Sequence, residues 1–258
     1  DNMKSKTLFF DKNGRYLRSE KNEIRGSEVE MIDENNYVFN IYSGMYYKYK
    51  SLNDKSFVVL DKNGNPKYTF AESLYSSTFH FTRARNLYKF GNKVYCNVNF
   101  KNTIYEITKD SVYAKYKIKL WDDKLEERTF SSSDEVREYI DNNYFFNGIF
   151  VELEDYSYFA IGAPIYGELK LLYDHKTHEC TSISNDSYDP MLSFFTSPKE
   201  RFSDNTLVES IPLNRIMFFK DLFLKEFPDN ESIKKLYDNL ELDSNPVLFF
   251  YNVSIDNN

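Results

Sequence analysis

Three side chains able to bind an anion, His80, Arg83 and Arg85, lie within six residues of each other. Guanidinium and imidazole groups form charge-assisted hydrogen bonds with anions, and alternate residues of a strand point to the same side. These residues are therefore candidates for binding an anionic or sugar ligand. The alternative interpretation is that Arg83 and Arg85 form surface ion pairs with acids such as Glu28 or Glu30.

A group of tyrosines offers a second candidate binding surface, with Tyr46 and Tyr47 at its centre and Tyr37, Tyr42 and Tyr49 nearby. Tyrosine combines a large contact area with a polar tip, so it stacks on sugar rings and is frequent in protein interfaces. Packing between neighbouring sheets uses tyrosine in the same way, and this is the alternative interpretation of the group.

Several potential metal ligands lie close together where His175, His178 and Cys180 follow Asp174. Zinc binds such side chains in a tetrahedral set. The spacing matches no zinc motif, however, and the segment lies where a turn between two strands is expected. We predict a turn here, no metal site and no cofactor.

The sequence contains no recognised catalytic motif. G-x-S-x-G, the phosphate-binding P-loop and H-E-x-x-H are all absent from it. Glu152, Glu154 and Asp155 could serve acid–base chemistry, but a run of acids at a hairpin bend is usually only solvated. No catalytic residue is therefore assigned.

The composition indicates a folded protein and excludes some partners. The 258 residues include 23 Phe and 22 Tyr, which supply ample surface for a core. A net charge of -7 argues against nucleic-acid binding, which requires clustered cations. No apolar run is long enough to predict a transmembrane segment in this chain. Cys96 and Cys180 are interpreted as two buried thiols rather than a disulfide.

Short strands joined by polar turns dominate the sequence pattern. Asp-Lys-Asn-Gly follows an apolar strand twice, at 11–14 and at 61–64. Asn-Gly favours the positive φ angles of a two-residue turn, so both copies predict hairpins. The alternative, a calcium loop, requires a glutamate at its twelfth position, where counting from Asp11 gives Asn22. The repeat distance lies in the range typical of four-stranded propeller blades.

Further hairpins extend this pattern to about five blades. The strands would form antiparallel meanders over residues 7–19, 28–71, 79–120, 145–184 and 191–254. The last strand, 246–253, is so apolar that we predict it to be buried.

Short helices are predicted near residues 133–143 and 215–240. Ser132 and Glu135 form a capping box at the start of the first helix. Apolar residues at helical spacing over 233–240 indicate an amphipathic face in the second region.

Four segments resemble those of a known family: FFDKNGRYL at 9–17, VLDKNGNP at 59–66, NTIYEI at 102–107 and NPVLFFY at 245–251. In this order they resemble the six-bladed β-propeller proteins of gut anaerobic bacteria. The resemblance implies an all-β fold of four-stranded antiparallel blades, with residues 1–258 forming a single propeller domain. Members of that family are usually longer at the N-terminus, so we expect this chain to lack leading blades.

The resemblance also implies a location and a function. Family members typically carry secretion or lipoprotein signals, which implies a periplasmic or cell-surface protein. Our leading hypothesis is a non-catalytic propeller that binds a glycan, a peptide or an envelope protein. A propeller hydrolase or lyase acting on a glycan or small molecule in the central channel is the alternative, and a structural role in an envelope assembly is a third hypothesis.

Overall fold

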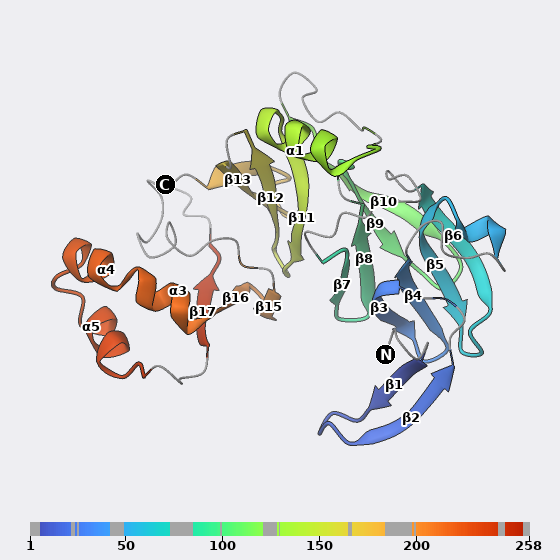
Figure 1. Ribbon diagram of the computed structural model, residues 1–258, viewed down its shortest axis with the longest axis horizontal. Coiled ribbons are helices and arrows are strands. Elements are labelled where there is room, and N and C mark those ends of the chain that lie inside the picture. Colours follow the sequence, from blue (N-terminus) through green and yellow to red (C-terminus); the bar gives the residue numbers. More distant parts are fainter. Residues whose placement is uncertain are drawn as a thin grey trace. The chain divides into compact units, whose positions relative to one another are not determined.

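Strands with a few short helices make up the chain in a computed structural model (Figure 1). The structure describes residues 6–21, 24, 26–41, 49–72, 85–98, 100–120, 128, 130–164, 167–183, 198, 200–241 and 246–254. The chain divides into two compact units. Unit 1 comprises Asp1–Phe150 and Phe159–Leu169, and unit 2 comprises Val151–Tyr158 and Lys170–Asn258.

The described strands pair into antiparallel sheets. Their bounds are β1 (Lys6–Phe10), β2 (Tyr16–Lys21), β3 (Gly26–Asp33), β4 (Asn36–Ile41), β5 (Lys55–Asp61), β6 (Pro66–Glu72), β7 (Leu87–Phe90), β8 (Lys93–Asn97), β9 (Thr103–Ile107), β10 (Val112–Lys117), β11 (Phe145–Glu152), β12 (Tyr156–Ala163), β13 (Gly167–Asp174), β14 (Cys180–Ile183), β15 (Glu200–Ser203), β16 (Thr206–Ile211) and β17 (Val247–Asn252). The helices are the 3-10 turn η1 (Lys50–Leu52) and α1 (Ser133–Asn142), α3 (Leu213–Phe218), α4 (Lys220–Glu226) and α5 (Glu231–Asp238).

Strand order in each sheet follows the sequence, as a meander requires. β3 to β6, β7 to β10 and β11 to β14 form sheets of four strands, β15 to β17 form a sheet of three, and β1 and β2 form a hairpin. This arrangement confirms the predicted all-β fold of four-stranded antiparallel sheets. Among the described residues, the hairpin and the three-stranded sheet have fewer strands than a full blade.

The two Asp-Lys-Asn-Gly turns share one geometry. Asp11 Oδ1 accepts the backbone N–H groups of Asn13 and Arg15 at 2.8 and 2.9 Å. Asp61 Oδ1 accepts the N–H groups of Asn63 and Asn65 at the same two distances. Positive φ occurs only at the glycines, 78° at Gly14 and 81° at Gly64. The expected two-residue turn is therefore wrong, because the aspartate stabilises a longer turn with only glycine left-handed.

The sheet of β3 to β6 is covered on both faces. Val38 on β4 and Val59 on β5 are fully buried in the core shared with β7 to β10. Tyr37 and Phe39 point to the opposite face, where Phe9 of the hairpin packs against a second core. A two-layer sandwich leaves one face of each sheet to solvent. Burial on both faces therefore indicates sheets stacked in series, as the blades of a propeller are.

Helix α1 closes the core of unit 1 at one side. Ser132 Oγ accepts the N–H of Glu135 at 3.3 Å, as the capping prediction requires. The Glu135 carboxylate binds the backbone N–H and the hydroxyl of Ser131 instead of Ser132. Val136 and Tyr139 of the helix are buried in the core that contains Val38.

In unit 2, three short helices cover one face of the sheet of β15 to β17. The helical region predicted near 215–240 consists of three helices, and Phe219 separates the first two, α3 and α4. Asn230 caps α5 by accepting the N–H groups of Ser232 and Ile233. Ile211 of β16 packs with buried helix residues, among them Ile216, Phe223, Ile233 and Tyr237. None of the helices in the described ranges is both long and apolar enough to cross a bilayer.

Strand β17 is only half buried, so the prediction of a buried last strand is wrong. Its residues alternate between partly covered and exposed. Val247 and Phe249 pack against the helices, while Leu248 and Phe250 on the other face are 55% and 49% exposed. The helices cover one face of this sheet and leave the other exposed. The apolar composition of the strand does not reveal this difference between its two faces.

Both cysteines are free thiols. Cys96 is completely buried in the core between β4 and β8, where burial raises the pKa of its thiol well above the usual value. Cys180 is exposed at the start of β14. The prediction of two buried thiols is therefore right for Cys96 and wrong for Cys180.

Candidate ligand-binding surface

One of the five predicted binding residues, Arg85, lies within the described part of the chain. His80, Arg83, Tyr46 and Tyr47 lie outside the described residues. Arg85 lies two residues before Leu87, where the first strand of its sheet, β7, begins. The structure therefore allows a site to be built around Arg85.

Arg85 is held between two neighbouring first strands. Its Nη2 forms an ion pair with Glu30 Oε1 on β3 at 2.9 Å, and its guanidinium carbon lies 6.0 Å from the centre of the Tyr88 ring. The pairing with Glu30 is the one proposed in the alternative interpretation of the sequence. The Arg85 side chain is still 41% exposed. It is thus positioned by protein contacts and accessible to a ligand.

A second contact, made by the carboxylate of Glu28, joins the same two strands. The Glu28 carboxylate on β3 accepts the backbone N–H groups of Asn86 and Leu87, at 2.8 and 3.1 Å to Oε2. Burial raises the pKa of Glu28 above its usual value, although these hydrogen bonds act in the opposite direction. The first strand of one sheet is therefore anchored to the first strand of the next by a partly buried carboxylate.

Polar and apolar groups alternate along this part of β3 and β7. Lys89 donates from Nζ to the carbonyl oxygen of Met31 at 2.8 Å. The side chains of Val29 and Met31 on β3 are 43% and 40% exposed, but strand alternation points them to the opposite face from Glu30. We call Glu30, Arg85 and Lys89 the first-strand surface. It combines two cations with one carboxylate, which suits an anionic ligand.

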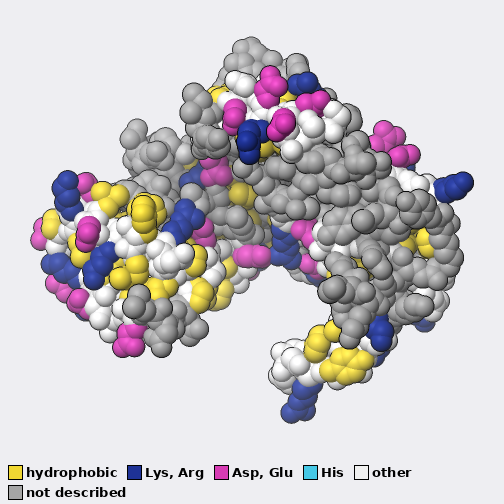
Figure 2. Space-filling view, viewed as in Figure 1, with side chains coloured by type: hydrophobic (Ala, Val, Ile, Leu, Met, Phe, Trp, Pro, Cys, Tyr) yellow, Lys and Arg dark blue, Asp and Glu magenta, His cyan; other side chains and the backbone are white. Residues whose placement is uncertain are grey.

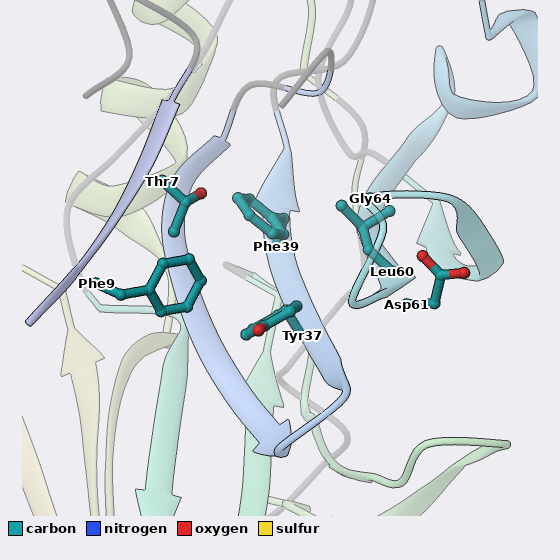
Figure 3. Close-up of a pocket in the computed structure, with 7 residues that line it drawn as sticks. All are labelled: Thr7, Phe9, Tyr37, Phe39, Leu60, Asp61 and Gly64. Atoms are coloured by element: carbon teal, nitrogen blue, oxygen red, sulfur yellow. The ribbon is translucent and has the colours of Figure 1, made fainter. Parts of the chain in front are cut away.

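The pocket in Figure 3 lies elsewhere in unit 1, beneath the N-terminal hairpin. Its lining residues are Thr7, Phe9, Tyr37, Phe39, Leu60, Asp61 and Gly64. The Tyr37 hydroxyl is buried and has no hydrogen-bond partner among the described residues. A volume of about 10 Å³ is close to the lower limit for one water molecule, so the pocket is too small for an organic ligand.

The segment considered for zinc forms the predicted turn between β13 and β14. Asp174 Oδ1 accepts the N–H groups of Lys176 and Thr177, and these bonds lower the pKa of Asp174. His178 Nδ1 contacts the Tyr173 hydroxyl at 2.9 Å. No group of three potential ligands in the described ranges could hold a metal ion.

Sequence reasoning missed one polar cluster in unit 2. Ser157 Oγ lies 2.7 Å from Glu152 Oε2 and 2.7 Å from His175 Nε2. The sequence offers Glu152 as an acid–base or solvated carboxylate and His175 as a turn residue or metal ligand, and it does not predict that they meet. These residues come from β11, β12 and the turn after β13, so only the pairing of three strands could reveal the cluster.

The antiparallel sheets follow one another in the sequence, and the sheet of β3 to β6 is buried on both faces. These two features define the class of this protein as a β-propeller. The sequence profile of the family DUF5128, described as "6-bladed beta-propeller", matches residues 1–208. The chain belongs to this family, which confirms the predicted resemblance.

A solved structure supports the same fold. The chain is similar to a "Putative exported protein" of Bacteroides fragilis, with a TM-score of 0.67 and 17% sequence identity. The similarity covers 98% of this chain and 73% of the Bacteroides protein. At this identity the likeness shows the fold. None of the curated proteins matches the sequence.

Proposed function

We propose that this chain is a non-catalytic, single-domain β-propeller of the cell envelope that binds an anionic ligand at the first-strand surface. The ligand is an acidic glycan, a peptide or an acidic segment of an envelope protein. The observation that carries the proposal is the Arg85 guanidinium, 41% exposed yet fixed by Glu30 at 2.9 Å. A cation held in place loses little conformational freedom when it binds a carboxylate.

A second cation lies on the strand that follows Arg85. Lys89 of β7 reaches the carbonyl oxygen of Met31 on β3, the strand that carries Glu30. Propellers place the first strands of their blades around the central axis, so a ligand there contacts several blades. His80, Arg83, Tyr46 and Tyr47 stay predicted ligand-binding residues, and they lie outside the described part of the chain.

The proposed envelope location rests on the comparisons. The similar Bacteroides protein is named as exported, and the resemblance stated from the sequence implies secreted or lipid-anchored members. An extracytoplasmic propeller would meet glycans and envelope proteins, which are the ligand classes proposed.

The test is a binding screen with the purified chain against acidic glycans, neutral glycans and acidic peptides, with turnover of each hit measured in parallel. We expect an acidic hit that the wild-type chain binds without converting it. Arg85→Ala should weaken this binding about tenfold or more, because a charge-assisted hydrogen bond is lost. Arg137→Ala, on the exposed face of α1, is the matched control and should bind normally. Turnover of a hit, or binding insensitive to Arg85→Ala, contradicts the proposal.

A further inference from the structure

The N-terminal hairpin has an exposed outer face of apolar side chains. Leu8 and Phe10 lie on the same side of β1, and Tyr16 is directly opposite Phe10 on β2. These three side chains are 42%, 54% and 57% exposed, and the Phe10 and Tyr16 ring centres are 6.0 Å apart. We call Leu8, Phe10 and Tyr16 the hairpin face. The inner side of the hairpin is covered, because Phe9 packs against Tyr37 there.

A second exposed apolar face lies on the sheet of β15 to β17 in unit 2, on the side opposite the helices. Leu248 and Phe250 of β17 are 55% and 49% exposed on this side. Phe202 of β15 is 64% exposed, and its ring centre lies 4.6 Å from that of Phe250. Val208 of β16 is paired with Phe250 and shares its side. We call Phe202, Val208, Leu248 and Phe250 the sheet face, which runs across all three strands.

Both faces are suited to a partner that presents another apolar sheet. Sheets pack on one another through apolar faces, and an exposed apolar patch on a folded protein marks an interaction site. Aromatic rings lie at the centre of both faces, and such rings supply large contact areas at protein interfaces. The hairpin already packs on a sheet in this way through its inner side.

Cations dominate the surroundings of the hairpin face. The charged side chains of residues 6–19 are the cations Lys6, Lys12, Arg15 and Arg18 and the acid Asp11. The Asp11 carboxylate accepts two backbone N–H groups of its own turn. Figure 2 shows Lys and Arg side chains beside the apolar ones at this hairpin. The hairpin face is therefore an apolar patch with a basic rim.

Acids dominate the surroundings of the sheet face. The charged side chains of residues 200–211 and 246–254 are the acids Glu200, Asp204 and Glu209 and the cation Arg201. Arg201 pairs with Asp204 at 3.0 Å. Glu200 lies directly opposite Val208, which places it on the exposed side of the sheet. The two faces thus have rims of opposite charge, so they attract one another, whereas two copies of the same face repel.

We propose that the hairpin face of one copy of this chain binds the sheet face of a second copy. Each copy carries one face of each kind, so the contact is head to tail. The aromatic rings of the two faces supply the contact area, and the opposite charges of the rims determine which faces pair.

The molar mass of the wild-type chain at increasing concentration is the first readout. Small apolar contacts are weak, so static light scattering should cover about 10 µM to about 1 mM. We expect the mass to rise with concentration, and to rise less at about 0.5 M sodium chloride than at low salt, because the charged rims are screened. A wild-type chain that stays monomeric, or an association that salt does not weaken, overturns the proposal.

Phe10→Ser and Phe250→Ser each remove the central ring of one face. Both side chains are about half exposed, so we expect both variants to fold, which thermal unfolding measures. Each substitution should raise the dissociation constant of self-association about tenfold or more, because a central aromatic ring carries much of the binding in such contacts. Leu248→Ser is a second variant of the sheet face and should weaken association in the same direction. Wild-type association in either face's variants overturns the proposal.

Phe218→Ser is the matched control. Phe218 on α3 is 82% exposed, more than any residue of the two faces, and it belongs to neither face. We expect this variant to associate as the wild type does. Loss of association in Phe218→Ser would mean that any exposed apolar side chain drives it, which overturns the pairing of the two faces.

Mixing the two face variants tests the head-to-tail pairing itself. Phe10→Ser keeps an intact sheet face and Phe250→Ser keeps an intact hairpin face, so neither variant can pair with itself. An equimolar mixture restores one intact contact between two copies. We expect the mixture to form dimers at concentrations where each variant alone is monomeric. A mixture that is no heavier than its separate components overturns the proposal.

Discussion

The carboxylate of Glu28 accepts the backbone N–H of Asn86 at 2.8 Å, so a side chain joins the first strands of two neighbouring sheets. The neighbouring N–H of Leu87 reaches the same oxygen at 3.1 Å. Backbone pairing cannot join two sheets that are stacked face to face, and this carboxylate supplies the hydrogen bonds instead. The same junction positions Arg85, which lies one residue before Asn86.

Glu28→Ala should destabilise unit 1 by about 3 kcal/mol, because two partly buried N–H groups lose their acceptor. Glu28→Gln keeps one oxygen that can accept both N–H groups, and should cost about 1 kcal/mol or less. Urea denaturation of both variants measures the difference. Equal losses in the two variants would show that the carboxylate does not join the strands as described.

The raised pKa of Glu28 predicts how its contribution depends on pH. Burial raises the pKa in the folded state above that of the unfolded chain, so the folded state binds the proton more tightly. The contribution of Glu28 to stability therefore increases as pH falls through the folded-state value. The stability of wild type relative to Glu28→Gln should be greater at pH 4.5 than at pH 7. The opposite order would contradict the burial of this carboxylate.

The two thiols should differ sharply in reactivity. Cys96 is completely buried with a raised pKa, whereas Cys180 is exposed. An alkylating reagent under native conditions should therefore modify Cys180 alone, slowly because partial burial also raises its pKa. Peptide mass spectrometry identifies the modified residue, and unfolding in urea should expose both thiols. Rapid native labelling of Cys96 would mean that the core around it is open.

The N-terminal hairpin has one covered face and one exposed apolar face. Phe9 packs against Tyr37, while Phe10 and Leu8 on the other face are 54% and 42% exposed, and Figure 2 shows apolar side chains at this hairpin. Exposed apolar surface on a two-stranded sheet promotes association. Phe10→Ser should therefore raise solubility and change stability by less than about 0.5 kcal/mol.

Phe9→Ala is the control for the hairpin prediction. It removes the ring that packs against Tyr37 and should cost about 2 kcal/mol. Light scattering against concentration measures association, and thermal unfolding measures stability. If Phe10→Ser destabilised the protein as much as Phe9→Ala, the outer face of the hairpin would have to be covered rather than exposed.

The sequence predicts local structure well where a side chain acts on its own neighbours. The Ser132 cap, the amphipathic face of α5 and the hairpins at Asp11 and Asp61 all depend on contacts within about five residues. The predicted length of the two Asp-Lys-Asn-Gly turns was wrong for a local reason too. Asn-Gly indicates a two-residue turn, but the aspartate that begins each motif binds two backbone N–H groups and makes the turn longer.

Contacts between residues far apart in the sequence could be predicted only in part. The Arg85 pairing with Glu30 follows from opposite charges and appears among the sequence alternatives. The cluster of Glu152, Ser157 and His175 depends on the register of three strands, which no local pattern specifies. Burial of β17 was overestimated because apolar composition does not show which face a neighbouring element covers.

Titration of an acidic ligand from the binding screen into wild type, Arg85→Ala and Arg137→Ala tests the central claim most directly. We expect Arg137→Ala to match the wild type and Arg85→Ala to weaken binding about tenfold or more, with wild-type affinity falling as salt is raised. Equal affinity in all three proteins would contradict a ligand site on the first-strand surface.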